Sequence, residues 1–479
     1  MSLKKNFLYS SILTVSTYLF PFLVYPYVSR TLGLSNIGIV NFVDNVINYF
    51  VLVSMMGIAT VGVREIAASR NERRGLSKTF MSLLSLNAIT TLIAVVALVV
   101  AMFVVPKLMP YRDLLGVGVV KLVFNLFLLE WFFAGMEDFK YITNRSLIVK
   151  CLYVLSVFVF VRDASDYRIY YVISVAMVVV NAVINIVYSR RFIDYDIRLT
   201  DFRPYLRAFF IMGVYVLLTN VYTSLNAVWL GFVTDTDEVG FFTTATKLHV
   251  IIMSVLASLT SILFPRVSSL LAENKRDEYW DKISTSLDAI YLFAFPTIAF
   301  VCVAGPALLH IIVGDGFEGS YLPLRIITPL VLVIGIEQIL VIQILMAMHK
   351  DGIVLRNSFV GAVVSVVFNM LLTARLGAVG SAIVWVVAEC AIMFVSMVDI
   401  YRSEKFVFPF ARLLAYCLSY APLIVGAVLT YRAIQSEYIA IIAVAMLTVA
   451  YAAVNESFVM KNKVADQFVS VIRRRINGR

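Results

Sequence analysis

Residues 80–105 read FMSLLSLNAITTLIAVVALVVAMFVV, a run of 26 residues without a charged side chain. About 20 consecutive apolar residues in an α-helix are enough to cross the hydrocarbon core of a bilayer. The run is far longer than the strands of a membrane β-barrel, which alternate apolar and polar residues over about ten positions. It therefore predicts a transmembrane helix.

Similar runs recur along the whole chain. Of its 479 residues, 61% are hydrophobic and 15% are charged, against about 45–50% and about 25% in soluble domains. Fourteen runs are long enough to span a bilayer, and they lie at 8–28, 37–62, 80–105, 113–134, 142–161, 168–188, 206–230, 240–264, 285–304, 322–347, 353–374, 378–400, 410–431 and 437–459. The expected fold class is an all-α polytopic membrane protein with about fourteen transmembrane helices.

The positions of the basic residues predict the orientation of these helices. Cytoplasmic loops carry an excess of lysine and arginine. With the N-terminus inside, 30 of the 40 basic residues fall in cytoplasmic segments and 7 in outer loops. A missed helix would invert this bias downstream of it, and no inversion occurs. We therefore expect both termini to be cytoplasmic.

The two halves of the chain are weakly related. At an offset of 202 residues, Gly38 falls on Gly240 and Arg64 falls on Arg266. Six helices separate the copies, so both have the same orientation, as in parallel repeats of transporters. We expect an N-lobe at 1–200, a C-lobe at 201–405, each of six helices and related by a parallel pseudo-two-fold, and two further helices with a basic tail at 406–479.

Charged residues inside the predicted spans point to a binding cavity, because ionisable groups in a bilayer usually face an interior or water. Asp44, Lys121 and Lys247 are predicted in the outer half of the membrane, with Arg30 and Arg325 near the mouth of the cavity. The four cations suit an anion such as a diphosphate. The alternative is that Asp44 pairs with Lys247 or Lys121 as a static bridge between helices.

Uncharged polar residues form stripes on the same predicted helices. Candidates for hydrogen bonds to sugar hydroxyls are Asn41, Asn45, Asn48, Tyr222 and Asn226. Such residues also join helices through hydrogen bonds without any ligand, and this alternative stays open for them.

Three carboxyl groups within the predicted spans are candidates for ion coupling: Glu337 and Glu389 near the middle of the membrane, and Asp44 in its outer half. A buried carboxyl can exchange a proton or bind a cation. The alternative is a neutral carboxyl bonded to a neighbour such as Gln338. His249 is expected to pack between helices. We find no catalytic constellation, no metal-ligand spacing and no nucleotide-binding loop, so we expect neither an enzyme nor a bound metal or cofactor.

Several short motifs, in their order and spacing, carry a family resemblance over nearly the whole chain. They are Ser29-Arg30-Thr31-Leu32-Gly33 with Gly38, Gly57 with Gly62-Val63-Arg64-Glu65-Ile66, Phe264-Pro265-Arg266-Val267-Ser268, and Gly314-Asp315-Gly316-Phe317-Glu318-Gly319-Ser320. The chain resembles the polysaccharide-transporter family, the O-antigen and capsule-repeat flippases of the multidrug, oligosaccharidyl-lipid and polysaccharide exporter superfamily.

This resemblance implies an undecaprenyl-diphosphate-linked oligosaccharide as substrate, alternating access as mechanism, and the bacterial inner membrane as location. It places Arg30 and Lys247 at positions where family members carry basic residues. Expected partners are membrane lipids, a polysaccharide polymerase and a chain-length regulator, but no nucleic acid. The alternatives are a multidrug or organic-cation exporter of the same superfamily and, less favoured because the outer loops are short, a membrane-embedded sugar transferase or polymerase.

Overall fold

The computed structural model describes residues 3–273 and 275–465, and some side chains within the helices, including that of Tyr222, lie outside the described set. The described residues form helices and their connections, with no strand among them. Ten helical segments of this part are long and apolar enough to cross a membrane. The predicted all-α polytopic class is confirmed, whereas the number fourteen stays a prediction.

Two of these segments are each too long for a single span. Val15–Ser69 and Asp351–Glu404 have 55 and 54 residues, about 80 Å of helix at 1.5 Å per residue, whereas the hydrocarbon core is about 30 Å thick. The first reverses at Gly33 with φ +75° and the second at Gly377 with φ +56°. Only glycine adopts such backbone angles readily, so a single residue makes each turn.

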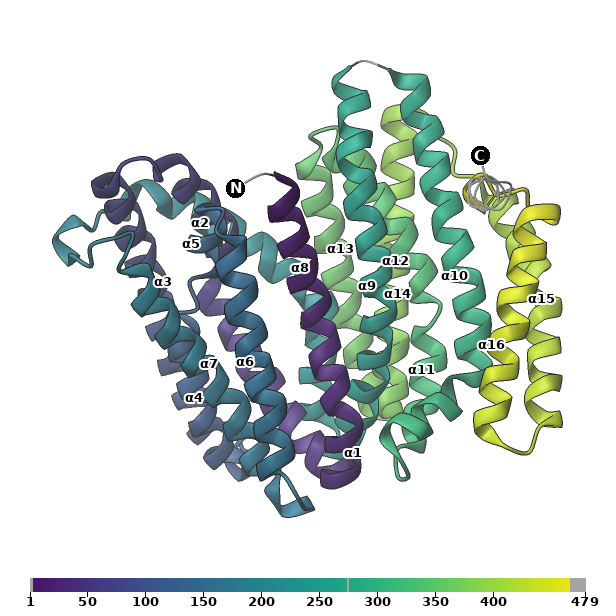
Figure 1. Cartoon of the computed structure of the whole chain (residues 1–479), viewed down its shortest axis with the longest axis horizontal. Helices are drawn as coiled ribbons and strands as arrows, with labels where there is room; N and C mark the ends of the chain where they lie inside the picture. The colour runs from purple at the N-terminus through teal and green to yellow at the C-terminus, as the bar shows by residue number, and fades with distance from the viewer. Residues whose placement is uncertain (1–2, 274, 466–479) are drawn as a thin grey trace. The chain divides into compact units, whose positions relative to one another are not determined.

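The chain divides into two compact units, Met1–Gly240 and Phe241–Arg479. The helices of the first, which we call unit 1, are α1 (Leu3–Met55), α2 (Ile58–Ser69), α3 (Arg73–Val104), α4 (Arg112–Asn125), α5 (Glu130–Gly135), α6 (Phe139–Phe160), α7 (Tyr167–Ser189), α8 (Leu206–Val233) and the start of α9 (Thr236–Ala272). Its long helices run side by side (Figure 1). Since α8 packs against α1 and α2, unit 1 extends past residue 200, and the predicted lobes stay a prediction.

The second, unit 2, contains the rest of α9, α10 (Arg276–Val313), α11 (Tyr321–Ile327), α12 (Leu330–Gln338), α13 (Asp351–Phe368), α14 (Ala374–Glu404), α15 (Phe410–Ala433) and α16 (Glu437–Val454). Segments with π-helical hydrogen bonding follow three of them, at Ile339–Met346, Asn369–Thr373 and Asn455–Val459. Short 3₁₀ turns lie at Met109–Tyr111, Ala164–Asp166, Ile197–Leu199, Arg203–Tyr205 and Glu318–Ser320.

The last two helices pack as a pair against α10 (Figure 1). A buried carboxylate joins them: Glu456 accepts hydrogen bonds from the hydroxyls of Tyr420 at 2.7 Å and Tyr416 at 3.0 Å. An unpaired carboxylate at this depth would be costly. The two phenols therefore stabilise the packing of α15 against the end of α16.

An aromatic cluster forms the core at one end of unit 1. Phe80 of α3 stacks on Trp131 of α5 with ring centroids 5.5 Å apart, and Phe132 meets Phe80 edge-on at 5.0 Å. All three side chains are buried. A methyl group added at Gly62 of α2 would lie 2.5 Å from the Trp131 ring. The missing side chain at Gly62 therefore lets α2 approach the indole.

Gly38 and Gly240, which align when the chain is compared with itself at an offset of 202 residues, lie close together where two helices cross. A Cβ atom added to Gly38 would lie 1.9 Å from the carbonyl oxygen of Thr236 and 3.4 Å from the backbone nitrogen of Gly240. A Cβ added to Gly240 would lie 2.7 Å from Leu34. The second half of α1 thus touches the start of α9 backbone to backbone, which no larger residue allows.

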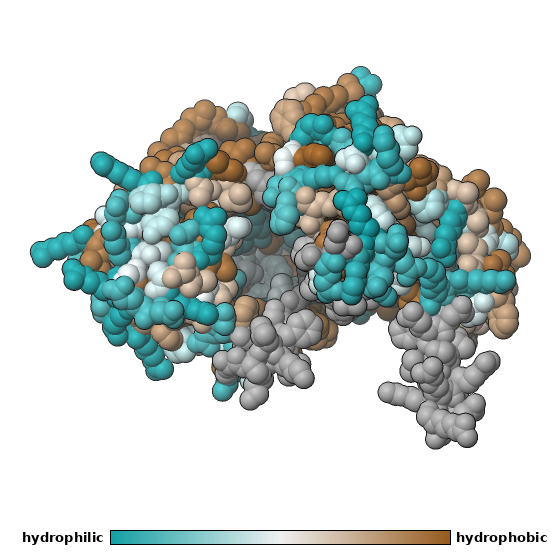
Figure 2. All heavy atoms as spheres, turned by 90° about the horizontal axis from the view of Figure 1, so that it is seen from above, coloured by the Kyte–Doolittle hydropathy of each residue, from teal (hydrophilic) through white to brown (hydrophobic). Residues whose placement is uncertain are grey.

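The outer flanks of the helices are apolar. On α3, Leu92 is 64% exposed, Ile93 61% and Val96 55%, a pattern typical of surfaces that face lipid rather than water. Hydrophilic residues instead crowd the helix ends that face the viewer in Figure 2, and hydrophobic residues show at the rim. This distribution fits helices that cross a bilayer end to end.

Candidate functional site

A charged triad lies inside unit 1 where α1 and α4 pack together. Lys121 Nζ of α4 lies 2.6 Å from Asp44 Oδ1 and donates to Asn48 Oδ1 at 2.8 Å. Asn48 in turn donates to the second Asp44 oxygen at 3.0 Å. Asp44 and Asn48 are four residues apart, so α1 presents both on one face. The three side chains close a ring of hydrogen bonds.

The triad is accessible rather than sealed. The Lys121 side chain is 17% exposed and that of Asp44 34% exposed. The sequence left two partners open for Asp44, Lys121 and Lys247. The structure pairs Asp44 with Lys121. Because one carboxylate balances the lysine, another oxygen anion could take the place of Asp44 next to Lys121.

Tyrosines of α6 and α7 surround the triad. The Tyr153 hydroxyl donates to that of Tyr170 at 3.2 Å, and both lie close enough to interact electrostatically with Asp44. Tyr171 is buried, and its hydroxyl has no hydrogen-bond partner among the described residues. Sequence reasoning missed these three residues, since tyrosines are frequent in this chain. The adjacent pair Tyr170-Tyr171 in an apolar run was the available signal.

The other predicted residues of unit 1 lie on α1, which also carries Asp44 and Asn48, and on α8. Asn41 and Asn45 are half-buried on α1, in the same half of the helix as Asp44, and Arg30 is exposed three residues before the Gly33 turn. Asn226 is fully buried on α8, which packs against α1. The side chain of Tyr222 lies outside the described residues, so its predicted role is untested.

Unit 2 holds the two remaining predicted cations. Lys247 is half-buried on α9. Arg325 is exposed on α11, and its Nε donates to the backbone carbonyl of Cys302 on α10 at 2.9 Å. Whether these cations converge with Lys121 stays a prediction.

The two predicted acidic residues of unit 2 form a pair between α12 and α14. Glu337 lies on α12 and Glu389 on α14, two helices that pack together, and the two carboxyl groups lie close enough to interact electrostatically. Trp385 Nε1 donates to Glu389 Oε1 at 3.0 Å, and Glu389 is 3% exposed. Two carboxylates offer no hydrogen to each other, so a hydrogen bond between them would require a proton on one of them. Glu337 also lies just before a π-helical segment, a feature frequent at functional sites.

His249 of α9 lies next to this pair. Its ring meets the Trp385 indole edge-on at 5.2 Å. The side chain is 1% exposed, and neither ring nitrogen has a hydrogen-bond partner among the described residues. The expected packed position between helices agrees with this geometry. Trp385 thus contacts His249 through its ring and Glu389 through its N–H.

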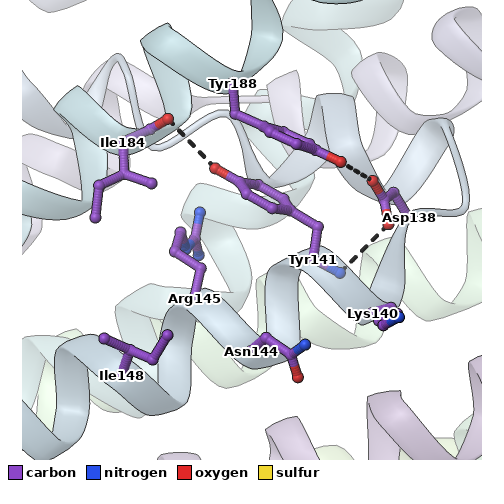
Figure 3. Close-up of a pocket in the computed structure, with 8 residues that line it drawn as sticks. All are labelled: Asp138, Lys140, Tyr141, Asn144, Arg145, Ile148, Ile184 and Tyr188. Atoms are coloured by element: carbon purple, nitrogen blue, oxygen red, sulfur yellow. Dashed lines mark hydrogen bonds between the residues drawn. The ribbon is translucent and has the colours of Figure 1, made fainter.

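A separate cavity of about 430 Å³ lies in unit 1 at the start of α6 and the end of α7. The residues that line it are Asp138, Lys140, Tyr141, Asn144, Arg145, Ile148, Ile184 and Tyr188 (Figure 3). The Tyr141 and Tyr188 rings stack at 3.7 Å between centroids. In the sequence, Lys140 and Arg145 served only to predict the orientation of the helices in the membrane, and this cavity was not predicted.

Across the described ranges, no three His, Cys, Asp or Glu side chains gather in a way that could hold a metal ion.

A family model described as "Polysaccharide biosynthesis protein" matches residues 3–271. The chain belongs to this family. It is also 24% identical over 408 residues to a protein of Escherichia coli K12 named "Putative O-antigen transporter", a match that covers 85% of this chain and 98% of that protein. A "Probable low-salt glycan biosynthesis flippase" of Haloferax volcanii is 23% identical over 34% of each chain.

The fold of this family member is similar to that of solved transporters. A lipid II flippase, MurJ, in an inward closed conformation matches with a TM-score of 0.78 at 11% identity, over 94% of this chain and 99% of the other. A transporter of the MOP superfamily from Pyrococcus furiosus, described as having a binding pocket of reversed polarity, matches with a TM-score of 0.53 at 13% identity, over 82% of this chain and 94% of the other. The chain is a multi-pass membrane protein with this transporter fold.

Proposed function

We propose that this protein is a flippase that moves an undecaprenyl-diphosphate-linked oligosaccharide repeat from the cytoplasmic to the periplasmic leaflet of a bacterial inner membrane. The match to the Escherichia coli protein over nearly its whole length supports this substrate class. The fold shared with a lipid II flippase supports a lipid-linked substrate. Both termini would be cytoplasmic, and a polymerase and a chain-length regulator would act on the product.

The observation that carries the proposal is the accessible Lys121 cation inside a membrane helix, balanced by one carboxylate at 2.6 Å. In this proposal the substrate diphosphate replaces Asp44 as the partner of Lys121. Further diphosphate contacts come from Arg30, Lys247 and Arg325. Sugar hydroxyls bond to Asn41, Asn45, Asn48, Tyr222 and Asn226.

Ion coupling follows from the same exchange. A proton or cation on Asp44 would remove the charge that competes with the diphosphate for Lys121. The adjacent carboxyl groups of Glu337 and Glu389 would supply a second exchange site in unit 2. Differential proton binding to the two states of the transporter would then bias alternating access.

The test is a double-mutant experiment on the triad. Lys121→Ala should abolish O-antigen display in a strain that lacks its flippase, and Lys78→Ala, an exposed lysine of α3, should leave display intact. A static bridge predicts that Lys121→Ala with Asp44→Asn regains function, since both charges are then gone. A diphosphate site predicts that this double variant stays inactive.

Membrane content and thermal unfolding of each variant separate loss of transport from loss of folding. Display by the double variant at the level of the parent protein would refute the diphosphate role of Lys121.

A second candidate function is export of organic cations. The acidic pair in unit 2 favours it, because carboxyl groups attract cations. A structure described as a multidrug resistance MATE family transporter of the MOP superfamily matches with a TM-score of 0.52 at 14% identity. Drug-sensitive cells distinguish the two: an exporter would raise resistance to cationic dyes, whereas a flippase would not.

A further inference from the structure

The cavity between α6 and α7 has the chemistry of a site for an anionic lipid head group. Three residues that carry nitrogen donors line it: Lys140, Asn144 and Arg145 (Figure 3). Lys140 makes no ion pair with any described residue. Basic pockets between transmembrane helices are typical binding sites for phosphate-bearing lipid head groups.

Arg145 is oriented for a ligand by partners that occupy only part of its guanidinium. Its side chain is 4% exposed, and Nη2 donates to Glu130 at 3.1 Å while Nη1 donates to Asn185. The buried Nε has no hydrogen-bond partner among the described residues. A buried donor without a hydrogen-bond partner destabilises the fold. The guanidinium therefore contributes a positive charge beside the cavity that one carboxylate, Glu130, partly balances.

The one carboxylate that lines the cavity is already engaged. Asp138 caps α6 by accepting from the Tyr141 backbone N–H at 3.3 Å, and its other oxygen accepts from the Tyr188 hydroxyl at 2.9 Å (Figure 3). Both oxygens of the Asp138 carboxylate are therefore already hydrogen-bonded, one to Tyr141 and one to Tyr188. The Lys140 ammonium and the positive charge of Arg145 therefore remain to attract an anion.

An apolar track leads away from the cavity along α6. Ile148 lines the cavity, and Leu152, Leu155 and Val159 follow at helical spacing, with exposures of 67%, 44%, 63% and 50%. Residues three or four apart lie on one helix face. The face suits an acyl chain, and Lys140 and Arg145 belong to the end of the protein that the charge distribution predicts to be cytoplasmic.

From these contacts we propose that the α6–α7 cavity binds an anionic phospholipid of the cytoplasmic leaflet, with its phosphate on Lys140, Asn144 and Arg145 and one acyl chain along α6. This site is separate from the Lys121 triad and does not depend on the transported substrate. It would retain a structural lipid against the outside of unit 1.

Native mass spectrometry of the full-length protein in detergent, titrated with phosphatidylglycerol, tests the proposal. Lys140→Gln should weaken retention of the lipid about fivefold, the loss expected for one basic residue near a membrane surface. Lys78→Gln, which removes a lysine of equal charge outside the cavity, should have no effect. Arg145→Gln should weaken retention further, with thermal unfolding measured to confirm that this variant is folded.

Three results would overturn the proposal. The first is equal retention by Lys140→Gln and Lys78→Gln. The second is equal retention of zwitterionic phosphatidylethanolamine, which would remove the role of charge. The third is displacement of phosphatidylglycerol by inorganic phosphate, or by undecaprenyl diphosphate at much lower concentration, which would identify a free-anion site or a substrate site instead.

Discussion

The backbone contact between α1 and α9 makes Gly38→Ala a stringent test of the structure. The added Cβ would lie 1.9 Å from the Thr236 carbonyl oxygen, where a separation above 3 Å is normal. Since the clashing atom belongs to the backbone, the helices must separate by about 1 Å. Overpacking of this kind costs typically about 1–3 kcal/mol, and we expect a loss near 3 kcal/mol because no flexible side chain can yield.

Gly116→Ala is the matched control for this substitution. Gly116 is also helical, but a Cβ added there meets no atom within 4 Å. Alanine should therefore stabilise α4 by roughly 0.5–1 kcal/mol through its higher helix propensity. The assay is the denaturant midpoint of the purified protein in detergent. Equal midpoints for the two variants would refute the close approach of Gly38 to α9.

Three further predictions concern buried groups. Glu389→Gln should make transport into proteoliposomes insensitive to an imposed pH gradient, and a gradient response equal to that of the parent protein would exclude the acidic pair from coupling. Gly62→Ala should destabilise the protein by about 2 kcal/mol, because its methyl group would lie 2.5 Å from the buried indole of Trp131. An unchanged denaturant midpoint for this variant would contradict that contact. Tyr420→Phe should cost about 1–3 kcal/mol by leaving Glu456 with one partner fewer, whereas Tyr438→Phe, at a side chain 65% exposed, should be neutral by the same assay.

Hydropathy and charge were sufficient to predict the fold class, because transmembrane helices must satisfy their own backbone hydrogen bonds and face lipid with apolar side chains. The offset that pairs Gly38 with Gly240 also matched two glycines that meet in space. Hydropathy also predicted the span ends on either side of Gly33, at 8–28 and 37–62, and of Gly377, at 353–374 and 378–400. It does not show that the backbone turns at a single glycine with positive φ in each case.

The candidate site was predictable only in part. Asp44 and Lys121 were recognisable as costly charges within apolar runs, but the pairing was not, because Lys247 was an equally suitable partner for Asp44. Which residues meet depends on helix rotation and packing, and a single sequence carries little information on either. The α6–α7 cavity was missed for a different reason: Lys140 and Arg145 lie at the end of a span, where basic residues are normally explained by membrane orientation.

The one-residue turns at Gly33 and Gly377 affect how the topology of this protein can be mapped. An epitope or a cysteine label placed there would replace the residue that allows the backbone to reverse, so it would report on a damaged hairpin. The segment around residues 162–166, with several exposed polar side chains, tolerates a reporter better. Labelling from outside the cell at that segment would establish the sidedness of unit 1 without altering either reversal.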